Sequence, residues 1–569
     1  MLSDPTAYRK KLHGWLSYAF ASEVFVIVSL TLFLPICLEQ FARDNGYLLP
    51  DKTEPCTPLV KSESRAGYVD DAAARCVVKI GWAWIDSASF SLYVYSISVA
   101  LQALTVISMG GIADHPPHRK RLLLVFALLG ATAATVFLVL PSTSPVWFLA
   151  APLAVCANVG FGASAVAMNA YLPSLAKESP EVQQILAEID SEHESTSSST
   201  GHHDLDNDPS GPDHEHPSSP LIQRAPSDEV QVLKAKYDTE LSRVMSRISS
   251  LGIALGYGAG IFLLIVALIP VTLLHGSTFA LRLAIGLSGI WWVVFSIPAA
   301  LWLPGSESSR IDGADEWTEG VTPVSNGISS DKWSTRREVV AAWKRLGIML
   351  RWREIKTLKN TFKYLAAWFL LSDGFTTITS TAILFGKTTL HMKPSALILV
   401  GVLTPTAGIL GSLAWPVLQR RFEWTNLKVI VILVMMASAI PAYGCLGFLP
   451  VFQGDATRFG GLTTQGEMFA LAVYFGSVYG AFQGYARAFY AELLPPGEEA
   501  RWYGLFSITD KSSSFIGPLI VGLIADTTGN IRYAFFFLVT MIWMAVPILV
   551  NVDVEKGRKD AREYRYVLS

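Results

Sequence analysis

The chain has 569 residues, of which 51% are hydrophobic and only 16% are charged, whereas a soluble domain carries about a quarter charged residues. This composition excludes a soluble multidomain enzyme. The formal net charge of −2 supplies no general basic field, so we expect no nucleic-acid partner.

Twelve apolar stretches predict membrane-spanning helices, because about 20 apolar residues are needed to cross a bilayer. The first six stretches cover residues 14–38, 87–112, 122–141, 146–172, 248–272 and 280–303. The second six cover residues 363–386, 395–418, 427–450, 467–493, 502–525 and 532–551. We therefore predict an all-α membrane protein with the twelve helices in two pseudo-symmetric bundles, residues 1–303 and 363–569. Many secondary transporters are built in this way.

The distribution of Lys and Arg predicts the orientation in the membrane, since basic residues gather on the cytosolic side. Arg119, Lys120 and Arg121 follow the second span, and Arg420 and Arg421 follow the eighth. Both clusters lie on the side of the chain termini. We therefore expect a cytosolic N-terminus and a cytosolic C-terminus.

Two polar segments are expected on this cytosolic side. Residues 181–229 are rich in acidic residues and serine, which predicts a disordered linker, and their histidines fit no closed metal site. Within the inter-bundle loop 304–362, Val339, Trp343, Leu346 and Leu350 recur at helical spacing among basic residues. This pattern indicates an amphipathic helix on the membrane surface; an exposed helix without lipid contact is the alternative.

Cys56 and Cys76 lie between the first two spans, on the predicted non-cytosolic side. We predict a disulfide between them, because a disulfide can persist on that side of the membrane. Free thiols are the alternative.

Charged side chains inside the hydrocarbon are functional candidates, because they are costly there. Glu23 and Asp373 lie at equivalent depths in the first helix of each half. Either acid could carry a coupling proton or contact substrate, with hydrogen-bonded packing as the alternative. Asp510 and Lys511 lie near mid-depth in the eleventh span and point about 100° apart on a helix. We expect each to have a partner on another helix, and Lys511 could pair with Asp373 or Glu23, or hold a substrate carboxylate.

Arg487 and Glu492, near the cytosolic end of the tenth span, could form a gating pair or an ordinary structural pair. Polar residues elsewhere in the spans could line a cavity or serve packing: Tyr18, Gln102, Asn158, Asn169 and Gln483. The run Gly386-Lys387-Thr388 resembles the end of a phosphate-binding loop, but position 381 is Thr rather than Gly. We expect no enzyme activity, no metal and no cofactor.

The loop after the second span reads Gly110-Gly111-Ile112-Ala113-Asp114-His115-Pro116-Pro117-His118-Arg119-Lys120. It resembles the signature of the major facilitator superfamily: a glycine, an acid four residues later and a basic cluster. Pro117 and His115 depart from the usual glycine and arginine. The resemblance implies a major facilitator fold in which Asp114 and Arg119 stabilise the outward-facing state.

A finer resemblance, to the fungal autophagy-related protein 22 family of vacuolar amino-acid effluxers, is carried by runs in the membrane region: 14–25, 34–40, 86–93, 371–377 and 483–513. It implies export of amino acids, such as leucine, isoleucine and tyrosine, from the vacuole lumen to the cytosol during autophagy. Alternating access, proton coupling and a monomer in the vacuole membrane are expected. A non-transporting scaffold or receptor in autophagy or vacuolar trafficking is the alternative.

Overall fold

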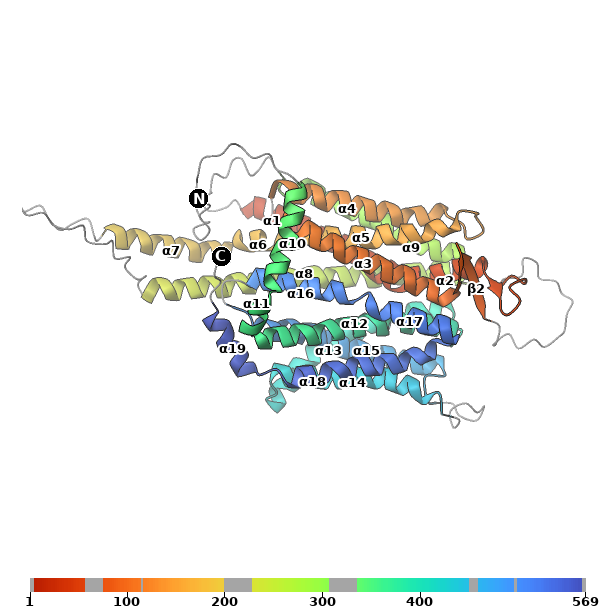
Figure 1. The fold of residues 1–569 in the computed structure, drawn as a ribbon. Coiled ribbons are helices and arrows are strands. Elements are labelled where there is room, and N and C mark those ends of the chain that lie inside the picture. Colours follow the sequence, from red (N-terminus) through yellow and green to blue (C-terminus); the bar gives the residue numbers. More distant parts are fainter. Residues whose placement is uncertain are drawn as a thin grey trace, which may run out of the picture.

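The computed structural model describes residues 5–56, 75–113, 116–198, 228–305, 335–449, 459–495 and 499–564. The axes of the long helices are roughly aligned, and the N-terminal half of the chain lies against the C-terminal half (Figure 1). This arrangement agrees with the two helical bundles that the sequence predicts. Among the described residues, the only strands are three short ones between the first two spans.

The first bundle begins with a continuous helical rod made of α1 (Pro5–Val24), a π-helical segment (Phe25–Phe33) and α2 (Leu34–Asp44). Its other spans are α3 (Ser87–Ala113), α4 (Pro116–Val136), α5 (Ala150–Asn169), α8 (Asp228–Leu273) and α9 (Thr278–Trp302). Short 3₁₀ turns (Phe137–Val139 and Trp147–Leu149) flank the connection from α4 to α5. Within this bundle α1 packs on α8 and α9, and α5 packs on α3 and α4.

The second bundle contains α12 (Lys359–Thr388), α13 (Pro394–Phe422), α14 (Asn426–Leu446), α15 (Gln465–Ala491), α16 (Glu499–Ser513), α17 (Ile516–Thr528), a 3₁₀ turn (Ile531–Tyr533) and α18 (Ala534–Val550). Here α13 packs on α15, and α12 packs on α16 and α18. The bundles meet where α3 contacts α16 and α17 and where α8 contacts α13. The interface is therefore formed by the second and fifth spans of the first bundle and by their counterparts in the second bundle, the eighth and eleventh spans.

Ten helices in the described part are long and apolar enough to cross a membrane. The remaining two predicted spans are helical as well, but they do not meet that criterion. α15 carries Gln483 and Arg487, and the eleventh span is broken into α16 and α17 at Ser514–Phe515. Pro518 explains the break, because proline has no N–H to bond the carbonyl of Ser514.

The two ends of the bundles differ. Strands β1 (Tyr47–Leu48), β2 (Cys76–Ile80) and β3 (Ala83–Asp86) form an antiparallel sheet in the order β1-β2-β3. This sheet lies at one end of the molecule, which we call the disulfide end (Figure 1). Both termini lie at the other end, the terminal end, together with α7 (Pro180–Ser198), α10 (Thr335–Met349) and α19 (Val554–Glu563). Two shorter helices, α6 (Leu172–Lys177) and α11 (Trp352–Thr357), complete the fold.

The prediction of disorder from residue 181 to 229 is wrong at its beginning, because α7 continues to Ser198. Val182 and Ile185 are buried and α7 packs on the part of α8 that extends beyond the bundle. The carboxylate of Glu181 accepts a hydrogen bond from Arg247 at 2.9 Å, which lowers the pKa of Glu181. The acidic composition predicted a disordered chain, but Val182 and Ile185 bury their side chains as α7 packs on α8. Residues 199–227 lie outside the described residues.

The predicted amphipathic segment is helical as α10 and α11. α10 runs across the terminal end, roughly at right angles to the spans (Figure 1). It packs on α3, and the indole nitrogen of Trp343 donates to the Ser108 hydroxyl at 3.2 Å. The segment that connects the bundles is therefore itself fastened to the first bundle.

Candidate functional site

Glu23 lies on α1 at the interface between the bundles and is half-buried. Its side chain packs over Gly256 of α8, where an added Cβ would lie only 2.5 Å from the Glu23 Cβ. Among the described residues, Glu23 makes neither a hydrogen bond nor an ion pair. Its charge interacts electrostatically with Lys511 and then with Arg487, both of the second bundle.

The second bundle faces Glu23 with a polar stripe along α15. Tyr479, Gln483 and Arg487 follow one another at intervals of four residues, which places them on one face of the helix. Gln483 donates to the Tyr479 hydroxyl at 2.8 Å. Tyr257 of α8 interacts electrostatically with both Glu23 of its own bundle and Arg487 of the other bundle.

Asp373, the counterpart of Glu23, has a different environment. It is 2% exposed, and its Oδ1 accepts from the backbone N–H of Gly517 at 3.0 Å and from the Thr377 hydroxyl at 3.5 Å. The carboxylate therefore satisfies an otherwise free N–H in the first turn of α17. Within the described part, Asp373 has no cationic partner.

Asp510 and Lys511 form an ion pair with each other at 3.4 Å. Asp510 also has the expected partner on another helix, since Ser372 donates to its Oδ1 at 2.5 Å. The predicted pairing of Lys511 with Asp373 or Glu23 is absent from the described residues. The long, flexible side chain of Lys511 reaches Asp510 although the two side chains leave the helix about 100° apart.

The predicted pair of Arg487 with Glu492 is wrong. Glu492 instead pairs with Arg558 of α19 at 2.5 Å and accepts from Asn426. Five residues along a helix correspond to a rotation of roughly 140°, so the two side chains point apart. Arg487 is left exposed.

Arg119 contacts the C-terminal end of α3, where its Nε donates to the Ala113 carbonyl at 2.9 Å. Its guanidinium also lies 5.0 Å from the ring centre of Tyr171. A cation at a helix C-terminus is stabilising. Asp114, its predicted companion, lies outside the described residues.

The predicted cavity residues do not form one set. Gln102 and Asn158 are buried and bond to each other, with the Gln102 amide 2.9 Å from the Asn158 carbonyl oxygen. This pair serves packing between α3 and α5. Asn169 is exposed. Tyr18 is fully buried, and its hydroxyl lacks a hydrogen-bond partner in the described structure. Gln483 lies about one helical turn from Arg487 on α15.

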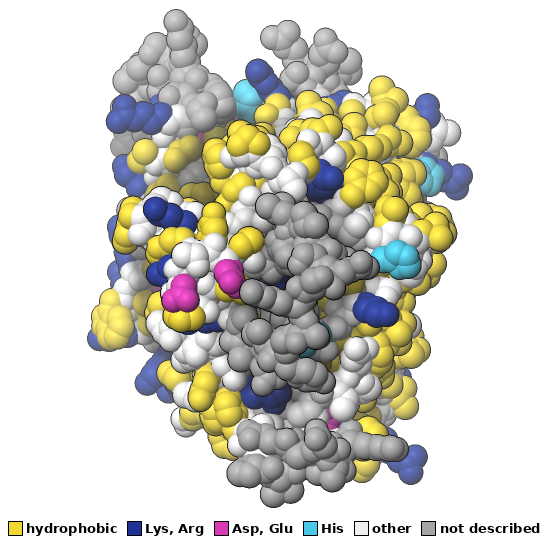
Figure 2. Space-filling model, turned by 90° about the vertical axis from the view of Figure 1, so that its right-hand side faces the viewer, with side chains coloured by type: hydrophobic (Ala, Val, Ile, Leu, Met, Phe, Trp, Pro, Cys, Tyr) yellow, Lys and Arg dark blue, Asp and Glu magenta, His cyan; other side chains and the backbone are white. Residues whose placement is uncertain are grey.

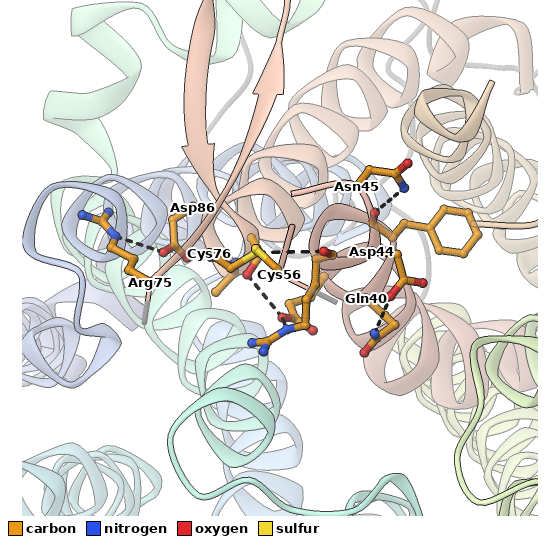
Figure 3. Close-up of a disulfide and its surroundings, with 12 residues drawn as sticks. Gln40, Asp44, Asn45, Cys56, Arg75, Cys76 and Asp86 are labelled. Atoms are coloured by element: carbon orange, nitrogen blue, oxygen red, sulfur yellow. Dashed lines mark hydrogen bonds and ion pairs between the residues drawn. A yellow bond between two sulfur atoms is a disulfide. The ribbon is translucent and has the colours of Figure 1, made fainter. Parts of the chain in front are cut away.

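At the disulfide end, Cys56 and Cys76 are bonded, with a Cα–Cα distance of 5.9 Å (Figure 3). Arg75, the residue before β2, pairs with Asp86 at 3.1 Å and with Asp526 of α17 at 3.7 Å. The Asp86 backbone N–H donates to Asp526 at 2.9 Å. Burial raises the pKa of the Asp86 carboxyl, against the opposing effect of Arg75. The sheet of the first bundle is thus fastened to the second bundle.

A buried ion pair that the sequence reasoning missed crosses between the bundles at the same end. Lys387, at the end of α12, pairs with Glu39 of α2, whose side chain is 0% exposed. Arg43 also pairs with Glu39 at 3.0 Å, and Lys387 donates to the Ile36 carbonyl at 2.9 Å. One feature of the sequence could have predicted this pair. Glu39 and Lys387 have opposite charges and lie at equivalent ends of the first helix of each half.

The face at the disulfide end carries scattered Lys, Arg, Asp and Glu side chains among apolar ones (Figure 2). Among the described residues, no group of three or more His, Cys, Asp or Glu residues could hold a metal ion. Two groups of charged residues in the described structure therefore bear on function: the bonds between bundles at the disulfide end, and the charges around Glu23.

Comparison with known proteins identifies the family and the fold. A family model described as "Vacuole effluxer Atg22 like" matches residues 7–562. Autophagy-related protein 22 of Cryptococcus neoformans is 41% identical over 97% of this chain and 96% of its own length. Autophagy-related protein 22-1 of Neosartorya fischeri is 38% identical over 98% of this chain and 92% of its own.

Solved transporters share the fold at low sequence identity. The POT family transporter PepTSo matches with a TM-score of 0.53 and 10% identity, over 98% of this chain and 99% of its own. The inward-open xylose transporter XylE from E. coli matches with a TM-score of 0.51 and 10% identity, over 96% of each chain. The predicted major facilitator fold is confirmed.

Proposed function

This chain belongs to the family of Atg22-like vacuole effluxers, and we propose that it exports neutral amino acids from the vacuole lumen to the cytosol. The family and the fold support a role in transport and autophagy for a multi-pass membrane protein. The proposal adds the substrate, for example leucine, isoleucine or tyrosine, and the direction. It also makes the disulfide end lumenal and the terminal end cytosolic.

The observation that carries the proposal is the set of bonds that joins the two bundles at the disulfide end. Glu39 with Lys387, and Arg75 with Asp526, hold the halves together there. A carrier that alternates its access needs such contacts, which form in one state and break in the other. A scaffold, in contrast, needs no contacts that form in one state and break in another.

Proton coupling is assigned to Asp373 in this proposal. A carboxylate buried without a cation is costly to keep ionised, and Asp373 has only neutral donors in the described structure. Its proton would control the hydrogen bond that begins α17, next to the interface with α3. Because the lumen is acidic, a proton that leaves with the substrate moves downhill, and each pH unit supplies about 1.4 kcal/mol.

The test uses the purified full-length protein in liposomes with labelled leucine. A pH gradient, acidic on the disulfide-end side, should drive leucine toward the terminal end. Asp373→Asn should abolish this pH-driven flux and keep exchange of leucine at equal pH, because the amide resembles the protonated acid. Glu178→Gln, at the carboxylate that pairs with Lys11 within the first bundle, is the matched control.

Two results would contradict the proposal. Absence of any leucine exchange by folded wild-type protein would favour the scaffold. Full pH-driven flux in Asp373→Asn would remove Asp373 as the proton site while leaving transport intact.

A further inference from the structure

Opposite charges of the two bundles face each other around Glu23 without touching. Glu23, of the first bundle, has neither a hydrogen bond nor an ion pair in the described structure, although Lys511 and Arg487 of the second bundle are near enough to act on its charge. The Arg487 side chain likewise has no partner among the described residues. Lys511 makes a 3.4 Å pair with Asp510 and keeps 43% of its side chain exposed.

Glu23 and Arg487 are thus charges at membrane depth without a partner in the described structure, and the cost of leaving such charges unsatisfied is high. Direct contact would be expected if Glu23 and the two cations served packing alone. The lack of direct contact in the described structure instead leaves these groups available to a ligand that carries both signs of charge. Such a ligand would complete the ion pairs that the protein leaves open.

The surroundings supply further polar atoms at the same place. Tyr257 is near enough to both Glu23 and Arg487 to interact with their charges, and its neighbour Gly256 leaves the space that the Glu23 side chain fills. On the opposite side, Tyr479 and Gln483 are bonded to each other on the face of α15 that also carries Arg487. The site is thus assembled from both bundles, as alternating access requires of a substrate site.

We propose that this is the binding site for the zwitterionic backbone of an α-amino acid, with its ammonium on Glu23 and its carboxylate between Lys511 and Arg487. The inference rests on the proposed function and specifies the part of the substrate that is recognised. Arg487 suits a carboxylate because its planar guanidinium can donate two parallel hydrogen bonds. By bridging the bundles, the substrate itself supplies the contact that favours closure at the terminal end.

The charge balance of the site also selects the side chain of the substrate. Glu23 and Asp510 offset Lys511 and Arg487, so the site has no net formal charge. A zwitterion with a neutral side chain preserves this balance. An acidic or basic side chain adds a charge for which the described residues at the site provide no counter-ion, and such amino acids should be poor substrates.

The test measures competition for leucine exchange by the full-length protein in liposomes at equal pH on both sides. The competitors are leucinamide, which lacks the carboxylate, and N-acetyl-leucine, which lacks the ammonium. Both should compete at least about a hundredfold more weakly than leucine, because a site built for a polar group strongly rejects analogues without it.

Variants then assign each charge. Glu23→Gln should raise the half-saturating concentration of leucine about thirtyfold, as expected for the loss of one charged hydrogen bond. It should also bring N-acetyl-leucine close to leucine while leucinamide stays weak. Lys511→Met and Arg487→Met should show the reverse pattern. Lys363→Met, which loses only a contact with the Asn551 carbonyl, is the control for removing a cation.

Three outcomes are distinguishable. Lack of leucine exchange in the wild type would overturn the proposed function itself. Equal competition by leucine and both analogues would overturn the zwitterion site while leaving transport established. Weaker binding of all three ligands by the same factor in Glu23→Gln would mean that Glu23 supports the fold and not the ammonium.

Discussion

Removing the buried ion pair at the disulfide end should shift the carrier toward the state that is open at that end. In Lys387→Met, Glu39 would remain fully buried and would keep Arg43 and Ser87 as its polar partners among the described residues. Loss of one partner from a buried pair costs about 3–5 kcal/mol. Because Arg43 remains, we expect the lower value, about 3 kcal/mol, for the closed state. This corresponds to a shift of about a hundredfold in the balance of states.

Ser89 provides the reporter for this shift. It is fully buried and its hydroxyl donates to the Gly522 carbonyl of α17 across the interface at 2.8 Å. A cysteine at position 89 should react with an impermeant maleimide only when the disulfide end opens. The background keeps the disulfide and has alanine in place of the free cysteines Cys37, Cys156 and Cys445.

Labelling of this cysteine from the disulfide-end side should be much faster in Lys387→Met. The double variant Glu39→Met with Lys387→Met should return toward the wild-type rate, because replacing a buried pair by apolar side chains is often neutral. Lys11→Met, at a partly exposed pair within one bundle, should leave the rate unchanged. Unaltered labelling in Lys387→Met would refute the idea that this pair holds the end closed.

Three further predictions concern other sites. Asp373→Asn should lose pH-driven leucine flux and retain leucine exchange at equal pH, both measured in liposomes. Gly256→Ala should weaken leucine binding, because its Cβ would lie 2.5 Å from that of Glu23, whereas Gly258→Ala, with open space around it, should not. Cys56→Ser should lower the thermal unfolding temperature, because the disulfide closes a separation of 20 residues and loops of this size contribute about 3 kcal/mol.

The sequence predicted the spans well because hydrocarbon imposes a length and an apolar composition on any helix that crosses it. The break in the eleventh span was also foreseeable, since Pro518 removes a backbone hydrogen bond. The α7 helix was not, because its stability depends on the contact of Val182 and Ile185 with a distant part of α8.

Partners of charged residues were the least predictable feature. Glu492 was matched to the nearest basic residue in its span, but in the fold it meets Arg558, 66 residues away. Glu39 and Lys387 pair across 348 residues, since 387 minus 39 gives that separation, and such pairs follow from tertiary packing alone. The equivalent depths of Glu23 and Asp373 were visible in the sequence, but only the structure separates their environments. Which of them carries the proton remains a prediction.

Leucine flux through the purified protein in liposomes tests the central claim most directly. With the disulfide-end compartment one pH unit more acidic, labelled leucine should accumulate on the terminal-end side, up to about tenfold for one coupled proton. Wild-type protein that is folded, correctly oriented and yet passes no leucine under this gradient, and exchanges none at equal pH, would contradict the account.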